Sequence, residues 1–135
     1  MSANLHKEIL TDEQIELLPL VTNNDNPELL AQKLAKLING NTLLIISSDL
    51  SHYQPYDEAV IVDQTTCQLI LDRDAAALAQ LPASACGLNG ILTLLDLAEQ
   101  LNWTPRLLKY ANSGDTSGDK AGVVGYASFV FINNQ

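Results

Sequence analysis

The feature that most restricts the possible folds of this chain is a continuous aliphatic run, TLLII (42–46), which passes directly into the polar stretch SSDLSH. A short apolar run bounded by turn residues is typical of a strand covered on both faces, as in a parallel sheet. Because α/β proteins bind ligands at the carboxyl ends of such strands, Ser48, Asp49 and His52 are expected to lie in a site.

The remaining elements are predicted from hydrophobic periodicity and from turn residues. We expect a short strand over 15–21, a helix between Asn26 and Gly40, helices over about 55–71, 74–81 and 88–101, and strands over 104–111 and 122–132 joined by a loop over 112–121. This order predicts a single α/β domain over 1–135, with a partly parallel central sheet flanked by helices.

Composition excludes several classes of partner. The chain of 135 residues has 7 Lys and Arg against 16 Asp and Glu, a net charge of −9, so it lacks the clustered positive charge that nucleic acid or an anionic membrane surface requires. The N-terminus does not resemble a signal peptide, and two cysteines are too few for a disulfide framework. We therefore expect a cytoplasmic protein that binds neither nucleic acid nor membranes.

Asp49 and His52 are the first candidates for chemistry. A carboxylate and an imidazole three residues apart can supply a metal ligand and an acid or base, or a pair in which Asp49 orients the imidazole. The structural alternative is that Ser48 or Asp49 accepts hydrogen bonds from free N–H groups of a following turn or helix. The spacing leaves both interpretations open.

Cys86 is the second candidate, because it directly precedes the helix predicted from residue 88. A helix N-terminus favours thiolate over thiol, which suits a metal ligand or a nucleophile. The alternative is a buried cysteine that acts as a small hydrophobic residue, which is the role we predict for Cys67. The stretch DTSGD (115–119) resembles the start of a calcium loop, but it lacks the glycine and the glutamate that such a loop needs at its sixth and twelfth positions.

Three ordered stretches, SSDLSHYQPYDEA, ACGLNGI and KYANSGDTSGDKAGVVGYASFVF, resemble one family over residues 42–135. They are similar to the Memo-like proteins, also named AmmeMemoRadiSam system protein B, whose fold is similar to that of class III extradiol ring-cleaving dioxygenases. The resemblance implies an iron or copper site in the family. It assigns catalytic roles to Asp49 and His52, a metal-ligand role to Cys86, and pocket-lining positions to Ser48, Tyr110, Asn112, Ser113 and Asp115.

The resemblance also implies what this sequence lacks. Family members carry an upstream half with a further pair of histidines, whereas the only other histidine here, His6, matches no family motif. The chain therefore resembles the C-terminal half of a Memo-like fold. We expect that it binds no metal, or binds metal poorly, when alone, because a mononuclear iron site needs three protein ligands. A second copy of the chain or a complementing upstream half is the expected partner.

Three functions stay open. The first is a protein related to metal-dependent dioxygenases, with a pocket formed by Asp49, His52 and Cys86 that is incomplete or inactive alone. The second is a binding or scaffold module of an AmmeMemoRadiSam system without enzymatic activity. The third is a cysteine hydrolase in which His52 activates Cys86.

Overall fold

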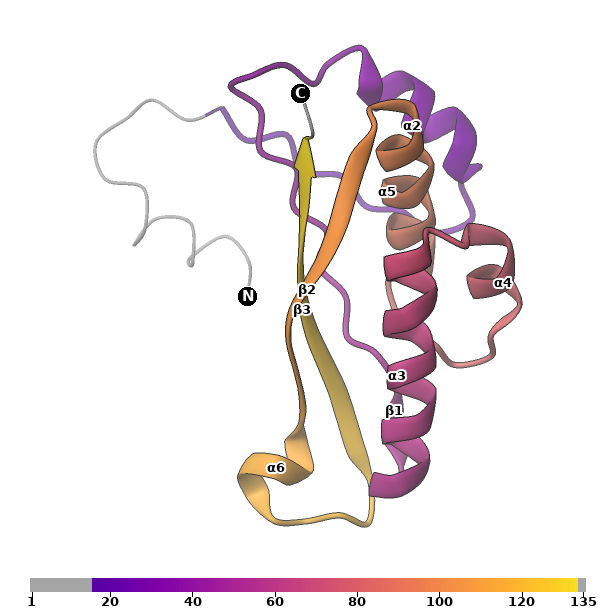
Figure 1. Ribbon diagram of the computed structural model, residues 1–135, viewed down its shortest axis with the longest axis vertical. Coiled ribbons are helices and arrows are strands. Elements are labelled where there is room, and N and C mark those ends of the chain that lie inside the picture. The colour runs from indigo at the N-terminus through magenta and orange to yellow at the C-terminus, as the bar shows by residue number, and fades with distance from the viewer. Residues whose placement is uncertain (1–15, 134–135) are drawn as a thin grey trace.

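A computed structural model describes residues 16–133 of the chain (Figure 1). Its helices and strands are, in chain order, α2 (Pro27–Ala35), β1 (His52–Gln54), α3 (Tyr56–Asp72), α4 (Ala75–Gln80), α5 (Leu88–Gln100), β2 (Trp103–Asn112), α6 (Ser113–Ser117) and β3 (Val123–Asn133). The fold is a mixed α/β arrangement, as the sequence predicted. His6 and residue 15, the first position of the strand predicted over 15–21, lie outside the described residues.

The helices begin and end where local chemistry favours it. The side chain of Asn26 accepts a hydrogen bond from the N–H of Leu29 and so caps α2, and Asp74 caps α4 in the same way. α3 ends at Asp72, and the next residue, Arg73, adopts the left-handed conformation that closes many helices. Among residues 16–133, no helix is both long and apolar enough to span a bilayer.

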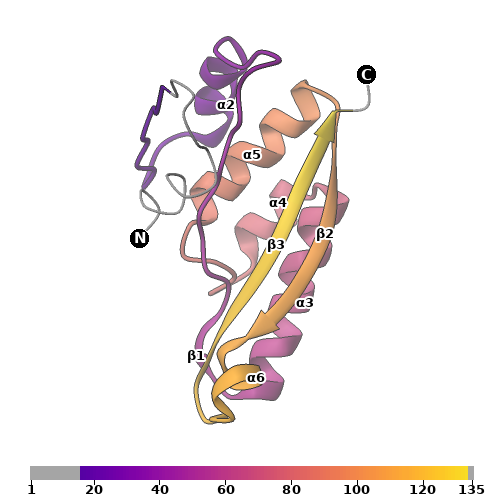
Figure 2. The ribbon, with the colours of Figure 1, turned by 90° about the vertical axis from the view of Figure 1, so that its left-hand side faces the viewer.

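The sheet of the described residues is antiparallel and has the order β1-β3-β2. β2 and β3 form a long hairpin, in which Trp103 pairs with Asn133 at one end and Asn112 pairs with Gly125 at the other. α3 and α5 lie on one face of this hairpin, and α2 packs against α5 (Figures 1 and 2). The fold therefore has one layer of helices on a narrow sheet.

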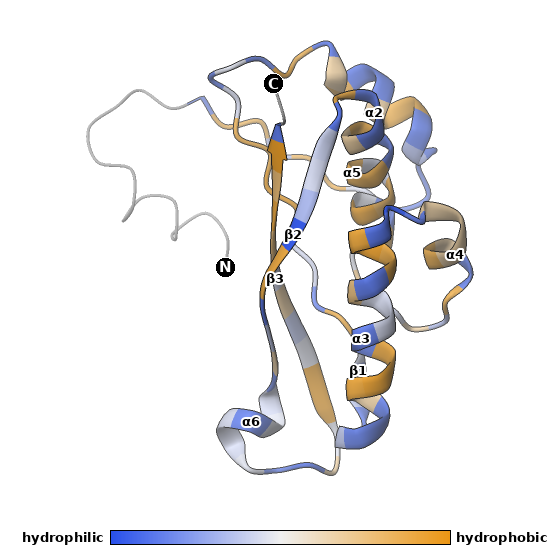
Figure 3. Cartoon of the chain, viewed as in Figure 1, coloured by the Kyte–Doolittle hydropathy of each residue, from blue (hydrophilic) through white to orange (hydrophobic). Residues whose placement is uncertain are grey.

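Two clusters of buried side chains hold the helices to the sheet. One contains Ile70, Leu78, Ile91 and Leu95, with Phe129 and Phe131 of β3 packed against it, and the other contains Ala31, Leu34 and Leu97, with Leu44 and Trp103 packed against it. Hydrophobic and hydrophilic residues alternate along α3 (Figure 3), because only one side of this helix faces the core.

The expected partly parallel sheet is wrong for the described residues. The prediction rested on the run 42–46 as a strand, but this segment takes no regular secondary structure. Leu44 and Ile46 pack against the two clusters, whereas Leu43 and Ile45 are 77% and 53% exposed. The run is apolar on both sides, which is why it resembles a buried strand. A strand also needs a neighbouring strand whose backbone forms hydrogen bonds with it, and hydrophobicity does not supply that neighbour.

Three shorter predictions also differ from the structure. Residues 16–21 of the expected strand over 15–21 are exposed and take no regular structure. β1 follows the aliphatic run where a loop was expected, because Leu50 donates to the carbonyl of Gly125 and brings the chain onto β3. α6 lies inside the expected loop over 112–121, where Asn112 and Asp115 form a reciprocal cap.

Gly125 of β3 is required by a buried carboxylate beneath it. Asp63 of α3 is fully buried, and a Cβ atom at position 125 would collide with its carboxylate oxygens. The absence of a side chain at position 125 therefore allows α3 and β3 to approach each other around a charged group.

We predict that Gly125→Ala destabilises the fold, because the added methyl group must displace the Asp63 carboxylate. Overpacking of this kind costs at least about 1–3 kcal/mol. Urea unfolding followed by circular dichroism measures the loss. Gly40→Ala is the matched control, since a Cβ atom there meets no atom within 4 Å, and its change should stay within about 0.5 kcal/mol. Equal unfolding midpoints for the two variants would contradict the prediction.

Candidate metal centre

Two segments that are 38 positions apart meet where the chain enters β1. The Asp49 N–H donates to the Cys86 sulfur over 3.2 Å, and the Cys86 N–H donates to the Asp49 carbonyl over 3.2 Å. The Gly87 N–H donates to the Ser48 hydroxyl oxygen over 2.8 Å. We call these contacts between 48–49 and 86–87 the crossing. It fixes the thiol beside the polar stretch that the sequence singled out.

The crossing is possible because position 87 has no side chain. A Cβ atom at Gly87 would lie 2.8 Å from the Ser48 Cβ and 2.9 Å from the Ser48 Oγ, closer than real side-chain atoms approach each other. Gly87 also precedes the first turn of α5, so Ser48 accepts one of the N–H groups that a helix N-terminus leaves free. Ser48 thus accepts from the start of α5, a distant helix, and not from the turn or helix that directly follows it, as the structural alternative had it.

Asp49, His52 and Cys86 lie together at this crossing. One ligand atom from each residue can be chosen so that all three lie within 4.8 Å of one another. The His52 Nε2 lies 3.5 Å from the Asp49 Oδ2. The His52 and Asp49 side chains are 34% and 48% exposed, and Cys86 is exposed as well. The three donors therefore form an accessible group at the rim of the sheet.

The donor set suits a metal ion in its chemistry, whereas its spacing is wider than a bound ion requires. A thiolate, an imidazole and a carboxylate together suit iron, copper or zinc rather than magnesium or calcium. A sulfur and a nitrogen bound to one tetrahedral ion lie about 3.5 Å apart. Donors spread over 4.8 Å must therefore close by about 1 Å on binding, which rotation of partly exposed side chains can supply.

The five residues predicted to line the pocket fall into two places. Ser48 lies in the crossing, with its Oγ 3.7 Å from the Cys86 sulfur. The other four gather where β2 ends and α6 begins. Tyr110 donates to Asp63, Asn112 and Asp115 cap each other, and the Ser113 hydroxyl accepts from the Val124 N–H. These contacts tie the end of β2 to α3 and the start of α6 to β3.

Electrostatics at α6 centre on Asp115. Its carboxylate accepts a backbone hydrogen bond from Asn112 and a second one, over 2.7 Å, from the Tyr56 hydroxyl. These two bonds, the backbone one first, lower the Asp115 pKa below its usual value. The same phenol–carboxylate bond is the main cause of the raised Tyr56 pKa. Tyr56 thus ties the start of α3 to α6, a contact that the sequence analysis did not predict.

Asp63 was missed as well, although the sequence contains a signal for it. The buried positions of α3 are Ala59, Asp63, Thr66, Cys67 and Ile70. Asp63 therefore occupies the helical stripe that faces the core, and a carboxylate on such a stripe needs hydrogen-bond partners. Cys67 is buried on the same stripe, as predicted.

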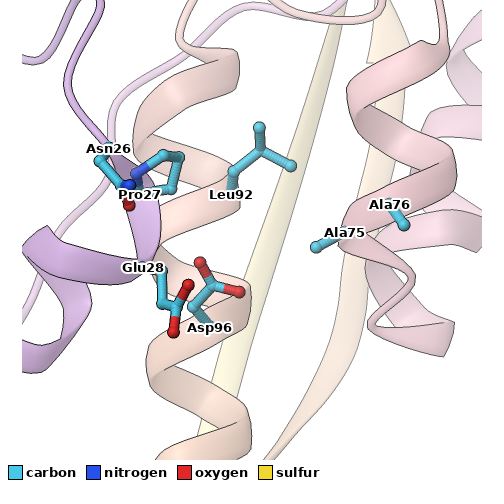
Figure 4. A pocket seen from close by; sticks show the side chains of 7 residues that line it. All are labelled: Asn26, Pro27, Glu28, Ala75, Ala76, Leu92 and Asp96. Carbon is cyan, nitrogen blue, oxygen red and sulfur yellow. The ribbon is translucent and has the colours of Figure 1, made fainter.

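One hollow among the described residues touches the donor group, and a second one lies between α2, α4 and α5. The hollow beside Cys86 is lined by Thr22, Asn23, Asn24, Asp25, Cys86, Gly87, Leu88, Asn89 and Leu92. The other hollow is lined by Asn26, Pro27, Glu28, Ala75, Ala76, Leu92 and Asp96, and Figure 4 shows the Glu28 and Asp96 carboxylates close together there. Burial, followed by the charge of Glu28, raises the Asp96 pKa.

Comparison with known proteins finds relatives for most of the chain. The sequence pattern of the family described as "Memo-like protein" matches residues 4–130. A "MEMO1 family protein" of Sulfurisphaera tokodaii is 35% identical over 131 residues, which is 89% of this chain and 46% of the relative. A "MEMO1 family protein" of Desulfurococcus amylolyticus is 38% identical over 130 residues, 88% of this chain and 46% of the relative. The chain spans about half the length of these relatives.

We predict that the two cysteines react very differently. Burial, and then the charge of Asp63, raises the Cys67 pKa to about 11, so only about one Cys67 in a thousand is thiolate at pH 8. Cys86 is exposed. Iodoacetamide at pH 8 should therefore modify Cys86 alone in the native protein and both cysteines in urea, as read by peptide mass spectrometry. Comparable labelling of Cys67 in the native protein would show that this prediction is wrong.

Proposed function

This chain belongs to the Memo-like family, and from that premise we propose that Asp49, His52 and Cys86 form the metal-binding part of a redox site related to that of ring-cleaving dioxygenases. The observation that carries the proposal is the meeting of three different donor types, drawn from two distant segments, within 4.8 Å. The names of the relatives state no reaction, so the reaction class rests on the resemblance of the motifs.

Each residue has a distinct role in this proposal. The Cys86 thiolate is the soft ligand, held by the Asp49 N–H. The His52 imidazole is the nitrogen ligand, and the Asp49 carboxylate, 3.5 Å away, either binds the metal or orients the imidazole. Iron or copper held there would supply one-electron redox chemistry with open positions for small molecules.

The chain alone binds such a metal weakly in this proposal. Its donors are partly exposed, so they must lose rotational freedom on binding. Because the relatives are about twice as long as this chain, further ligands and a cover for the site have room in the part of their sequence that this chain does not span. Full activity requires that part, or a second copy of this chain.

Titration with Co²⁺ under reducing conditions tests the site. We expect sulfur-to-metal absorption in the near ultraviolet for the wild-type chain and its loss in Cys86→Ser. His52→Gln should weaken binding by at least about tenfold. His6→Gln is the matched control, because His6 matches no family motif, and it should bind as the wild type does. If wild type and Cys86→Ser showed the same absorption during Co²⁺ titration, the proposal would be wrong.

The scaffold alternative predicts a different outcome for metal content. Elemental analysis after purification without chelators would then find a folded protein without metal that also takes up no Co²⁺. The cysteine hydrolase alternative is favoured only by the exposed Cys86 near His52. It requires Cys86 to react with iodoacetamide faster than an ordinary thiol does at neutral pH.

We further propose that two copies associate through the outer aliphatic surface. We define this surface by Leu43, Ile45, Val130 and Ile132, all of them exposed. Packing these exposed apolar side chains against a second copy would remove them from water, which favours association. Sedimentation at micromolar concentration should therefore show a dimer, and Leu43→Glu with Ile45→Glu should restore the monomer. A stable wild-type monomer would contradict this proposal.

A further inference from the structure

The geometry points to Asp63 as a positioning residue that, together with Tyr110, holds His52 in place beside Cys86. Asp63 touches neither His52 nor Cys86 in any hydrogen bond described above. It acts through the backbone of Ser51, the residue directly before His52. The inference deepens the proposed metal site and rests on it for its functional meaning.

The contacts fix the chain from two sides. The Ser51 N–H donates to the Asp63 Oδ1 over 2.9 Å, which ties the segment to α3. The Ser51 carbonyl accepts from the Gly125 N–H over 3.0 Å, and the Leu50 N–H donates to the Gly125 carbonyl over 2.9 Å, which ties it to β3. Three backbone groups of the two residues before His52 are therefore held, and they set the direction in which the His52 side chain points.

Tyr110 fixes the carboxylate itself. Its hydroxyl donates to the Asp63 Oδ2 over 2.7 Å, so each carboxylate oxygen has a partner from a different element. Burial, followed by the hydrogen bond to Asp63, raises the Tyr110 pKa. The phenol thus keeps its proton at physiological pH and remains a donor. With both oxygens engaged, the carboxylate is held against rotation.

The simpler interpretation is that Asp63 only accepts hydrogen bonds from core donors, the Ser51 N–H and the Tyr110 hydroxyl. That role has a cost, because a buried carboxylate loses hydration and its bonds to neutral donors recover only part of the loss. Position 125 must also lack a side chain to admit it. What Asp63 provides in return is direction, since its two oxygens accept from the Ser51 N–H and from the Tyr110 hydroxyl at the same time and so tie the chain before His52 to α3 and β2.

The experiment compares Asp63→Ala with a rescue variant and a control. Asp63→Asn keeps an oxygen for the Ser51 N–H and places its amide N–H group toward the Tyr110 oxygen, so it should behave as the wild type does. Asp74→Ala removes a capping carboxylate of α4, whose side chain accepts from the Ala77 N–H. It therefore controls for a loss of stability without a contact to the site.

Two readouts separate positioning from folding. The first is the nuclear Overhauser effect between the ring protons of His52 and the β protons of Cys86, measured without metal. Because the chain has two histidines, His6→Gln assigns the signals. The second readout is Co²⁺ affinity. We expect Asp63→Ala to lose the Overhauser effect and to bind Co²⁺ about ten- to a hundredfold more weakly, with Asp63→Asn and Asp74→Ala unchanged.

The possible results distinguish this inference from the proposed function. If the wild type takes up no Co²⁺, the proposed metal site fails, yet loss of the Overhauser effect in Asp63→Ala alone still supports positioning. If Asp63→Ala does not fold, Tyr110→Phe decides, with a weaker Overhauser effect and several-fold weaker binding expected. A folded Asp63→Ala, or in its place Tyr110→Phe, with both readouts as in the wild type overturns the inference.

Discussion

The crossing between residues 48–49 and 86–87 is the contact on which the candidate site depends. It joins the segment that leads into the sheet to the N-terminus of α5, and it consists of backbone N–H groups that donate to the Cys86 sulfur, the Asp49 carbonyl and the Ser48 hydroxyl. Because all three donors and the Asp49 acceptor belong to the main chain, the thiol is placed by main-chain geometry. A hydrogen bond from a flexible side chain would leave the thiol group freer to rotate.

Close approach at two glycines makes this arrangement possible. Gly87 lets the Ser48 side chain reach the start of α5, and Gly125 lets the Asp63 carboxylate lie under β3. In both places a polar group occupies the volume that a Cβ atom would fill. The stretch from Ser48 to His52 is thereby held between α5 on one side and α3 with β3 on the other. Because this stretch is fixed, the distance between the Cα atoms of Asp49 and His52 is fixed as well.

Local sequence signals predicted most of the helices and the hairpin. α3, α5 and the β2–β3 hairpin follow the expected ranges closely. α5 was predicted from its apolar stripe, α3 from the proline and acidic residues at its start, and the two strands from strand-favouring residues and the turn residues between them. The run 42–46 failed as a strand because an apolar segment still needs a ladder partner, and the run itself carries no information about one. Asp49, His52 and Cys86 were found from local patterns and the family resemblance. Their meeting, and the role of Asp63, depend on contacts between distant segments that spacing does not encode.

The candidate site is supported by hydrogen bonds on one side and is open to solvent on the other. Toward the helices its backbone is fixed by hydrogen bonds, whereas the Asp49, His52 and Cys86 side chains are open to solvent. Water around them weakens every electrostatic interaction with a bound cation, since charges attract far more strongly at low dielectric. A polypeptide that covers the donor group itself would exclude that water and restrict the same side chains. A cover would therefore strengthen metal binding even if it contributed no ligand of its own, and ligands from it would add to that effect.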